Sequence, residues 1–396
     1  MPPRAWQALG PLGEQVLWEA LQMVADPLRQ EEVQRDWPNM NESSMVFLPK
    51  LDPGVNGAAG DTRPLNISNG ENRVMANAVR YGFERAMKDW ISEMQQGFLP
   101  NRSMLKNVVD IDHKMQMDSL SGEDGGAMFF DFQAAFPSVV HGFLIDVMEF
   151  IGIPNNICTF IKNLYHNNRC NLIVGGDTCE GFLMQSGIRQ GCPLSPVIFA
   201  VAVDVLLRRA RRLLPAATVR AYADDICMAM GDIWAQIPLM QRLMQEFALC
   251  SGLELNLLKT VLVPLRVGDP ELLRDRLSLA APAWAPIKIE HSAKCLGFVL
   301  GPGRGHTSFN GALRKYKQRV NFWAATGSGT ALTLMAYRTY ILPVMSFLIQ
   351  LEGLPPQWEE LETWALQKLL PGPFRWCPPY LAKNLKDMGS RRTSRT

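Results

Sequence analysis

The sequence predicts an α+β fold with a ferredoxin-like βαββαβ sheet at its centre and a helical region after it. Two observations predict this class. Apolar strand candidates at 127–132 (AMFFDF), 219–230 (VRAYADDICMAM, two strands around a turn) and 260–265 (TVLVPL) are separated by segments with helical periodicity. From Ser308 onward, the chain has helical patterns rich in Trp, Tyr and Leu.

The segments before this sheet are predicted from local patterns. Residues 1–45 are expected to form helix and then loop, and MVFLPK (45–50) a strand. The glycines and prolines in 51–67 predict a mobile hairpin tip. The spacing of apolar residues between Glu71 and Gln96 predicts an amphipathic helix, and a polar link is expected at 119–126.

A long helix and a hairpin are predicted within the sheet region. Pro193 suits the first position of a helix that ends near Leu214. The segment CNLIVGGDTCEGFLMQ (170–185) predicts a hairpin that turns at residues 175–177. Further helices are predicted at 143–150, 157–165 and 233–250, and a last strand at 294–300.

Composition excludes several classes of protein. A chain of 396 residues can form two or three domains, and 47% hydrophobic content is ordinary for a globular protein. Since the formal net charge is only +2, any nucleic-acid-binding surface must gather positive charge locally. The eight cysteines include no CxxC pair, which argues against a zinc ribbon or a disulfide framework and favours reduced thiols in an intracellular protein.

No membrane partner is expected. The start, MPPRAWQALGPLGEQ, lacks the apolar region of a signal peptide. The most apolar run, residues 331–351, contains Arg338 and Pro343 near its middle, so we predict a buried helix there.

Two adjacent carboxylates, Asp224 and Asp225, lie in an apolar segment, where like charges raise each other's cost of ionisation. Asp131 ends the strand at 127–132, which in a βαββαβ sheet lies beside the central hairpin. The three carboxylates are therefore expected to meet, and such hard oxygen ligands suit Mg²⁺. For each Asp alone, a strand end or a hydrated turn is the simpler alternative. For all three in this sheet order, that alternative is much weaker.

Motifs in a fixed order carry a resemblance to a known family. They are FLPK (47–50), RPL (63–65), QQGFLPNRS (95–103), FFDFQAAF (129–136), SGIRQGCPLSP (186–196), AYADD (221–225), SGLELNLLKT (251–260) and KCLGFVL (294–300). Together they resemble the reverse transcriptases of non-LTR (LINE-like) retrotransposons. The resemblance implies a right-hand polymerase with fingers, a ferredoxin-like palm and a helical thumb. The implied parts are an N-terminal extension (1–45), fingers (46–125), palm (126–305, with an inserted fingers segment around 150–185), thumb (306–385) and a disordered tail (386–396).

The resemblance also implies a catalytic metal site. Asp131 and Asp224 are the main ligands of two Mg²⁺ ions, for which Mn²⁺ is a possible substitute. Asp225 lies beside them, and the backbone carbonyl of Phe132 assists. Lys259 falls where a lysine is proposed in the family to give a proton to pyrophosphate, and a surface lysine is the alternative reading.

Five further residues are implied to bind the nucleotide. Phe136 falls where the family places an aromatic ring beneath the incoming sugar, which selects deoxynucleotides by excluding a 2′-hydroxyl; a core Phe is the alternative. Lys50 and Arg63 match residues that hold the triphosphate, and solvated hairpin charges are the alternative. Gln190 and Gly191 match the loop that touches the nascent base pair, where glycine permits close approach to a ligand; an ordinary loop before a helix is the alternative.

Two positions depart from the family pattern. Pro137 stands where an acidic residue is common, and Cys295 stands where a Tyr usually precedes LG in the primer grip. A basic patch at the end of the long helix is expected to complement the helix dipole, with phosphate contact as the alternative. Its members are Arg208, Arg209, Arg211 and Arg212.

The resulting expectation is an intracellular nucleotidyltransferase, an RNA-directed DNA polymerase whose partners are an RNA template, a DNA primer and dNTPs. It would be nuclear if insertion is target-primed. The alternatives are a catalytically inactive retrotransposon-derived RNA-binding remnant and an intron-maturase-type reverse transcriptase, while Phe136 argues against an RNA-dependent RNA polymerase. No endonuclease, RNase H or zinc-knuckle segment is recognisable, so we expect a polymerase core of a longer element or a truncated copy.

Overall fold

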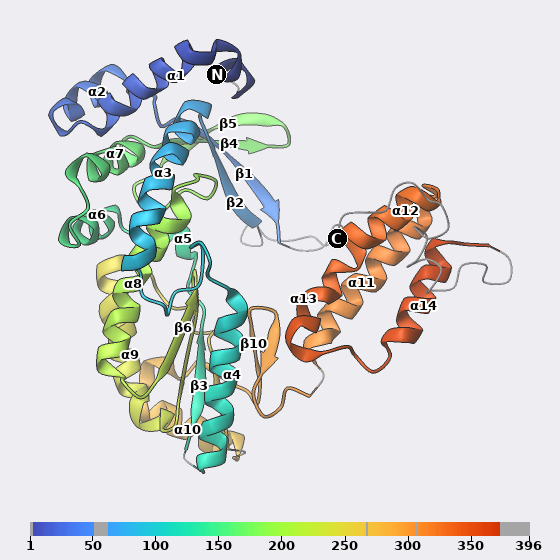
Figure 1. The fold of residues 1–396 in the computed structure, drawn as a ribbon. Coiled ribbons are helices and arrows are strands. Elements are labelled where there is room, and N and C mark those ends of the chain that lie inside the picture. Colours follow the sequence, from blue (N-terminus) through green and yellow to red (C-terminus); the bar gives the residue numbers. More distant parts are fainter. Residues whose placement is uncertain (1–2, 51–61, 123, 267, 306, 373–396) are drawn as a thin grey trace. The chain divides into compact units, whose positions relative to one another are not determined.

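The computed structural model describes residues 3–50, 62–122, 124–266, 268–305 and 307–372. The chain divides into two compact units, 1–290 and 291–396 (Figure 1). This division falls earlier in the sequence than the expected boundary between palm and thumb at 305/306, which stays a prediction.

The first unit is built around a five-stranded sheet, here called the central sheet. Its order is β6 (Thr218–Tyr222), β7 (Asp225–Met230), β3 (Gly126–Phe130), β8 (Val261–Pro264) and β9 (Lys288–Ile289). Strand β3 is antiparallel to both β7 and β8, as the βαββαβ pattern requires. The predicted α+β fold class is thereby confirmed.

Helices cover both faces of the central sheet. Figure 1 shows α8 (Ser195–Leu213) and α9 (Ile233–Ser251) on one side, and α4 (Met104–Ser121) on the other. All five residues of β3 are buried, because both faces of this strand are covered. The core therefore lies directly behind the strand end that leads to Asp131.

A second, four-stranded sheet, here called the outer sheet, has the order β2 (Thr62–Ser68), β1 (Ser43–Pro49), β4 (Arg169–Val174) and β5 (Asp177–Leu183). The predicted hairpin at 170–185 is confirmed. Its turn residues Gly175 and Gly176 both have positive φ, which glycine adopts without strain. The predicted hairpin tip between β1 and β2 falls at residues 51–61, which lie outside the described residues.

The predicted helix at 71–96 is too long at its C-terminal end. Helix α3 (Gly70–Trp90) ends earlier, and Ile91 is extended. Residues beyond it instead bond to β6, because Ala221 N donates to Met94 O (2.8 Å) and Gln96 N donates to Ala221 O (2.8 Å). Tertiary hydrogen bonding thus overrides a helical pattern.

Two other boundaries differ from expectation. Helix α4 occupies part of the polar link expected at 119–126 and was not predicted, although Ser103 caps its start and Gly122 ends it in a left-handed conformation. Helix α8 begins at Ser195, so Pro196 and not Pro193 lies in its first turn. The remaining helices of this unit are α1 (Pro3–Ala25), α2 (Gln30–Asp36), α5 (Ala135–Ser138), α6 (His141–Phe150), α7 (Asn155–Tyr165) and α10 (Pro270–Ala280).

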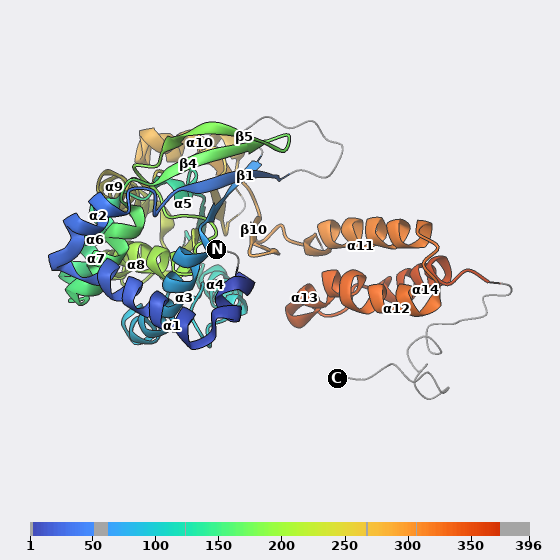
Figure 2. The same ribbon diagram turned by 90° about the horizontal axis from the view of Figure 1, so that it is seen from above.

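The second unit begins with a short hairpin, β10 (Ala293–Cys295) and β11 (Phe298–Leu300), and then is helical as predicted. The single strand predicted at 294–300 is therefore wrong, because the chain turns back at Leu296 and Gly297, which both have positive φ. Figure 2 shows its helices lying alongside one another. A buried chain of hydrogen bonds runs from Tyr316 through Tyr337 to Glu362, with oxygen–oxygen distances of 3.2 and 3.1 Å. The helices are α11 (Ser308–Ala325), α12 (Thr330–Ala336), α13 (Pro343–Glu352) and α14 (Trp358–Leu369).

The apolar run 331–351 does not form the one buried helix that was predicted. A π-helical turn at Tyr337–Ile341 separates α12 from α13, and several side chains, including Leu332 and Met335, are exposed. In the described part of the chain, no single helix has the length and apolar character of a membrane span. Only the pair 330–341 and 343–352, bent by 42°, has them jointly.

Candidate active site

The turn between β6 and β7 presents two carboxylates. Tyr222 and Asp225 face each other as the last pair of the hairpin, so Ala223 and Asp224 form a two-residue turn. Residues 222–225 are here called the acidic turn. Ala223 has φ of +57°, a left-handed conformation that glycine or asparagine usually takes in such turns. A strained backbone thus directly precedes Asp224.

Strand β3 brings a third carboxylate to this turn. Phe130 pairs with Ile226, so Asp131, the next residue, extends toward the level of Asp225. Its backbone is fixed on the other side, where Asp131 N donates to Thr260 Oγ1 (3.3 Å) and its carbonyl accepts from Asn256 N (2.7 Å). The predicted meeting of Asp131 with the Asp pair follows from this register.

The three carboxylates are held in an environment that opposes their ionisation. Although Asp225 is an exposed residue, partial desolvation of its carboxyl group and then the charges of Asp224 and Asp131 raise its pKa to about 6. Burial also raises the pKa of Asp224, with a further contribution from Asp131, and it raises the pKa of Asp131. Within the part of the chain that the structure describes, no cationic side chain forms an ion pair with any of them. Much of the cost of ionising them is therefore left for a bound cation to offset.

Three predicted cationic residues lie near enough to act on these carboxylates. The charges of Lys259 and Lys50 lower the pKa of Asp131, and that of Arg63 lowers the pKa of Asp224, but burial has the larger effect. Lys50 directly follows β1, and Arg63 belongs to β2, whose residues pair with those of β1. The outer sheet therefore directs positive charge toward the acidic turn.

The donor set fits a hard divalent cation. The carboxylates supply oxygen ligands, and the carbonyl of the buried Phe132 accepts no hydrogen bond from the described residues. Among those same residues, no three His, Cys, Asp or Glu side chains lie close enough together to hold a metal ion by themselves, so water and substrate would have to complete the coordination. An open arrangement suits Mg²⁺, which is bound by one or two carboxylates and completes its coordination with water and substrate phosphate.

Phe136 lies in a group of aromatic rings beside the acidic turn. It stacks on Phe199 with ring centroids 4.3 Å apart, and Phe98 meets it edge-on at 6.2 Å. Phe98 also contacts Tyr222 of the acidic turn, at 6.1 Å between centroids. Phe136 is only partly buried, so the ring is held rigidly while part of it remains accessible.

Gln190 and Gly191 lie against the outer sheet. Asn66 N donates to Gln190 O (2.8 Å), and a Cβ on Gly191 would lie 2.4 Å from Asn66 O. Gly191 also has φ of +124°. The close approach of strand β2 therefore requires glycine at position 191. The sequence analysis instead attributed this glycine to the close approach of a ligand.

Gln95 and Phe98 contact the acidic turn but were not singled out from the sequence. Gln95 bonds to both backbone groups of Ala223, and Phe98 touches both Phe136 and Tyr222. Both belong to QQGFLPNRS, a motif recognised only as part of the family pattern. The sequence offered one signal for their role, which is the pair of glutamines before Gly97. Glutamines that become buried need hydrogen-bond partners, so such a pair can indicate a contact with another segment.

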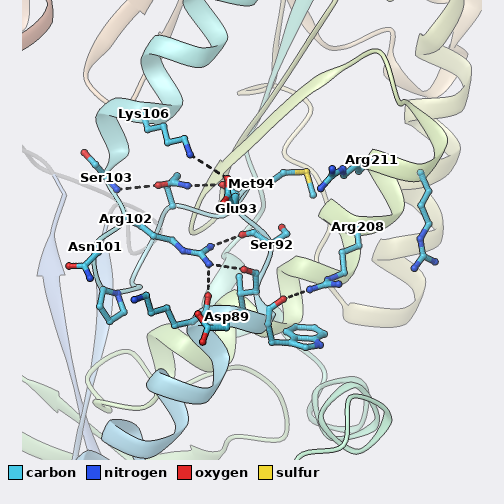
Figure 3. A pocket seen from close by; sticks show the side chains of 16 residues that line it. Asp89, Ser92, Glu93, Met94, Asn101, Arg102, Ser103, Lys106, Arg208 and Arg211 are labelled. Atoms are coloured by element: carbon cyan, nitrogen blue, oxygen red, sulfur yellow. Dashed lines mark hydrogen bonds and ion pairs between the residues drawn. The ribbon is translucent and has the colours of Figure 1, made fainter.

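The predicted arginine patch lies at the end of α8, and three of its four members line one cleft. Arg208 forms an ion pair with the buried Asp204 (2.7 Å) and stacks over Trp90 (4.4 Å from guanidinium carbon to ring centroid). With Arg211 and Arg212 it lines a cleft of about 920 Å³ between α8 and residues 88–106 (Figure 3). Arg209 faces away and pairs with Glu246. Asp131, Asp224 and Asp225 do not line this cleft.

Comparison with known proteins gives one family. A family model described as "Reverse transcriptase (RNA-dependent DNA polymerase)" matches residues 48–300, more than half of the chain. An uncharacterized 149 kDa protein of transposon TX1 from Xenopus laevis is 22% identical over 260 residues, which are 63% of this chain and 19% of that protein. The retrovirus-related Pol polyproteins of R2 retrotransposable elements are also similar. Those of Drosophila melanogaster and Bradysia coprophila are each 27% identical, covering 57% and 79% of this chain.

This chain spans only 21% and 36% of the lengths of those two polyproteins. Among solved structures, a telomerase from Candida tropicalis truncated from its C-terminal domain has a TM-score of 0.47 and 11% identity, covering 69% of this chain and 57% of that one. A telomerase of the same organism with a fragment of telomeric RNA has a TM-score of 0.46 and 10% identity, covering 90% and 63%.

Proposed function

Because this chain belongs to the reverse transcriptase family, we propose that it is an RNA-directed DNA polymerase that adds dNTPs to a primer 3′-hydroxyl on an RNA template, with two Mg²⁺ ions. The observation that carries the proposal is the gathering of Asp131, Asp224 and Asp225 at one end of the central sheet, where burial and mutual repulsion raise their pKa values more than the nearby cations lower them. Three carboxylates that raise each other's cost of ionisation are stabilised when divalent cations bind them.

In this reaction the primer 3′-oxygen bonds to the α-phosphorus of the dNTP, and the bond from that phosphorus to the pyrophosphate oxygen breaks. Mg²⁺ held by Asp131 and Asp224, with help from Asp225 and the Phe132 carbonyl, would activate the 3′-hydroxyl and offset charge on the leaving pyrophosphate. The proton of the 3′-hydroxyl passes to solvent.

The residues around the carboxylates have separate roles in the proposal. Lys50 and Arg63 hold the triphosphate. Both lie near enough to the acidic turn to act on its carboxylates, so their positive charges would attract the phosphates of a nucleotide bound there. Lys259, close enough to act on Asp131, gives a proton to the pyrophosphate. Phe136 lies beneath the sugar and excludes a 2′-hydroxyl, while Gln190 and Gly191 lie at the nascent base pair.

The test is incorporation of labelled dTTP on a poly(rA) template with an oligo(dT) primer and Mg²⁺. Wild type is compared with Asp224→Ala and with a control, Asp146→Ala, which removes an exposed carboxylate from α6. We expect incorporation by wild type and Asp146→Ala, and its loss in Asp224→Ala. Equal incorporation by Asp224→Ala would contradict the proposed role of the carboxylates.

A second candidate is an inactive RNA-binding remnant of a retrotransposon. Binding of the primed template by wild type without any incorporation, in Mg²⁺ or in Mn²⁺, would support the remnant over the polymerase.

A further inference from the structure

We propose that Gln95 is a positioning residue that holds the acidic turn in its strained conformation and so sets the place of Asp224. This inference rests on the proposed polymerase function for its kinetic consequences. Its structural part, that the turn depends on this one side chain, does not.

Gln95 makes three hydrogen bonds around the turn while fully buried. Its Oε1 accepts from Ala223 N and from Gly97 N, each at 2.9 Å, and its Nε2 donates to Ala223 O at 3.2 Å. Both backbone groups of Ala223 are thus satisfied by one side chain. In a two-residue hairpin turn such groups ordinarily face solvent, so this is a built contact.

The turn requires external support because of its own backbone. Ala223 has φ of +57°, and its methyl group is buried, so the residue cannot relax toward solvent. A left-handed conformation is costly for a residue with a Cβ and persists only where the surroundings hold it. Gln95 is the side chain in contact with both ends of that strained residue.

Gln95 is itself anchored by Arg102. The Nη1 atom of Arg102 donates to the carbonyl of Ser92 at 2.6 Å, and its Nη2 donates to those of Lys88 and Ile91, each at 2.7 Å (Figure 3). Nη1 also donates to the carbonyl of Gln95 at 2.6 Å. One guanidinium therefore ties the end of α3 to the backbone of Gln95.

The fit between the two segments is close. A Cβ on Gly97 would lie 2.5 Å from Ala223 N, so only glycine allows this approach. Two residues before Ala223, in β6, the carbonyl of Ala221 accepts a hydrogen bond from Asn107 Nδ2 (2.9 Å). Residues 94–97 thus form a seat for the acidic turn, and Gln95 is the side chain that bonds to its strained residue.

The kinetic consequence follows from chain connectivity. Ala223 directly precedes Asp224, so relaxation of Ala223 would displace the Asp224 carboxylate. Small displacements of a catalytic group lower the rate of the chemical step strongly. The hydrogen bonds of the Gln95 side chain go to Ala223 and Gly97 and not to the predicted triphosphate-binding residues, so nucleotide binding should change little.

The test compares Gln95→Met with Gln96→Met in primer extension. Gln96 is the matched control, since it is an adjacent buried glutamine whose side chain bonds to Glu93 O and Ser103 N and not to the turn. We expect kcat of Gln95→Met to fall about 10- to 100-fold with KM for dTTP within about threefold of wild type, while Gln96→Met stays within about threefold in both. An equal fall in kcat for the two variants would overturn the proposal.

Rescue and hydrogen exchange separate positioning from misfolding. Glycine adopts positive φ readily, so Ala223→Gly in the Gln95→Met background should recover kcat by about threefold or more, giving a non-additive double-mutant cycle. Loss of kcat without this recovery would place the role of Gln95 elsewhere and reject the inference. Amide exchange at residues 221–225 should be faster in Gln95→Met than in Gln96→Met. That measurement tests the support of the turn even if the wild-type protein proves inactive, and unchanged exchange would count against it.

Discussion

The ring of Phe136 lies nearly parallel to that of Phe199, with centroids 4.3 Å and planes 14° apart. Phe199 is fully buried in α8, so the position of Phe136 is set by the core of the first unit. A rigid ring beside the carboxylates is suited to discriminate by shape between sugars that differ in one hydroxyl.

Replacing Phe136 by Ala should therefore admit ribonucleotides. We expect the preference for dTTP over UTP, taken as the ratio of kcat/KM values, to fall about 100-fold, chiefly through a gain for UTP. Single-nucleotide extension of a primed RNA template measures it. Phe98→Ala, which removes the edge contact with Phe136 and the contact with Tyr222 but leaves the Phe136 ring in place, should lower the preference by a smaller factor. An unchanged preference in Phe136→Ala would show that the ring is simply part of the core.

The requirement for Mg²⁺ should depend on pH because protons compete with the cation. The pKa of Asp225 is raised to about 6, so this carboxylate is ionised near pH 8 and about half protonated near pH 6. The Mg²⁺ concentration that gives half-maximal incorporation should accordingly be flat at alkaline pH and rise as pH falls through about 6. Mg²⁺ titrations across this range measure it. The same requirement near pH 6 and pH 8 would contradict it.

Asp225→Asn should stabilise the metal-free protein. A carboxyl whose pKa is raised on folding binds its proton more tightly in the folded state, so its ionisation costs stability as pH rises from about 4 to about 6, and the whole cost is present above that. Removing the charge should raise the free energy of unfolding by about 0.5–1 kcal/mol near pH 8, a modest gain because the side chain is exposed and solvent screens it. Urea denaturation with EDTA measures this difference.

Two further conditions check that explanation. Near pH 4 the gain should shrink, because the wild-type carboxyl is then largely protonated in the folded state. With Mg²⁺ present, wild type should gain more stability than Asp225→Asn. A variant less stable than wild type near pH 8 without metal would show that the charge is not repelled there.

Gly191→Ala should be destabilising for a backbone reason. The added Cβ would lie 2.4 Å from Asn66 O at a residue with φ of +124°, so strand β2 must shift. We expect the free energy of unfolding to fall by about 1–3 kcal/mol. Gly82→Ala is the control, since nothing lies within 4 Å of its Cβ and alanine suits the interior of α3; it should gain about 0.5–1 kcal/mol. Equal stability of Gly191→Ala and wild type would contradict the close contact.

The part of the site that sequence could predict is the part set by strand order. Once β3, β6, β7 and β8 are assigned to a βαββαβ sheet, Asp131 must lie beside the hairpin of Asp224 and Asp225. The aromatic and basic residues around them came from resemblance to a family. Their local roles, such as the approach of Gly191 to Asn66, could not be read from the motif.

The part that sequence could not predict depends on tertiary hydrogen bonds. Helical spacing continues past Trp90, but the chain leaves the helix there because the backbone of 91–96 is bound by Arg102 and by β6. Gln95 can reach the acidic turn only because the helix ends at Trp90, and the sequence pattern did not show that end. Helix α4 is a different kind of error, since Ser103 at its cap and Val108, Ile111 and Met115 at helical spacing were visible in the sequence.

The two sheets of the first unit take their strands from the chain in alternation. The outer sheet uses 43–68, the central sheet 126–130, the outer sheet again 169–183, and the central sheet 218–289. Strand β1 can therefore pair with β4, its parallel neighbour, only after β3, which lies between them in the sequence, has also been synthesised. During synthesis neither sheet can close before most of the unit has left the ribosome. For the same reason, no single cut along the chain separates two complete sheets: a fragment that ends after residue 183 holds the whole outer sheet together with β3 of the central sheet.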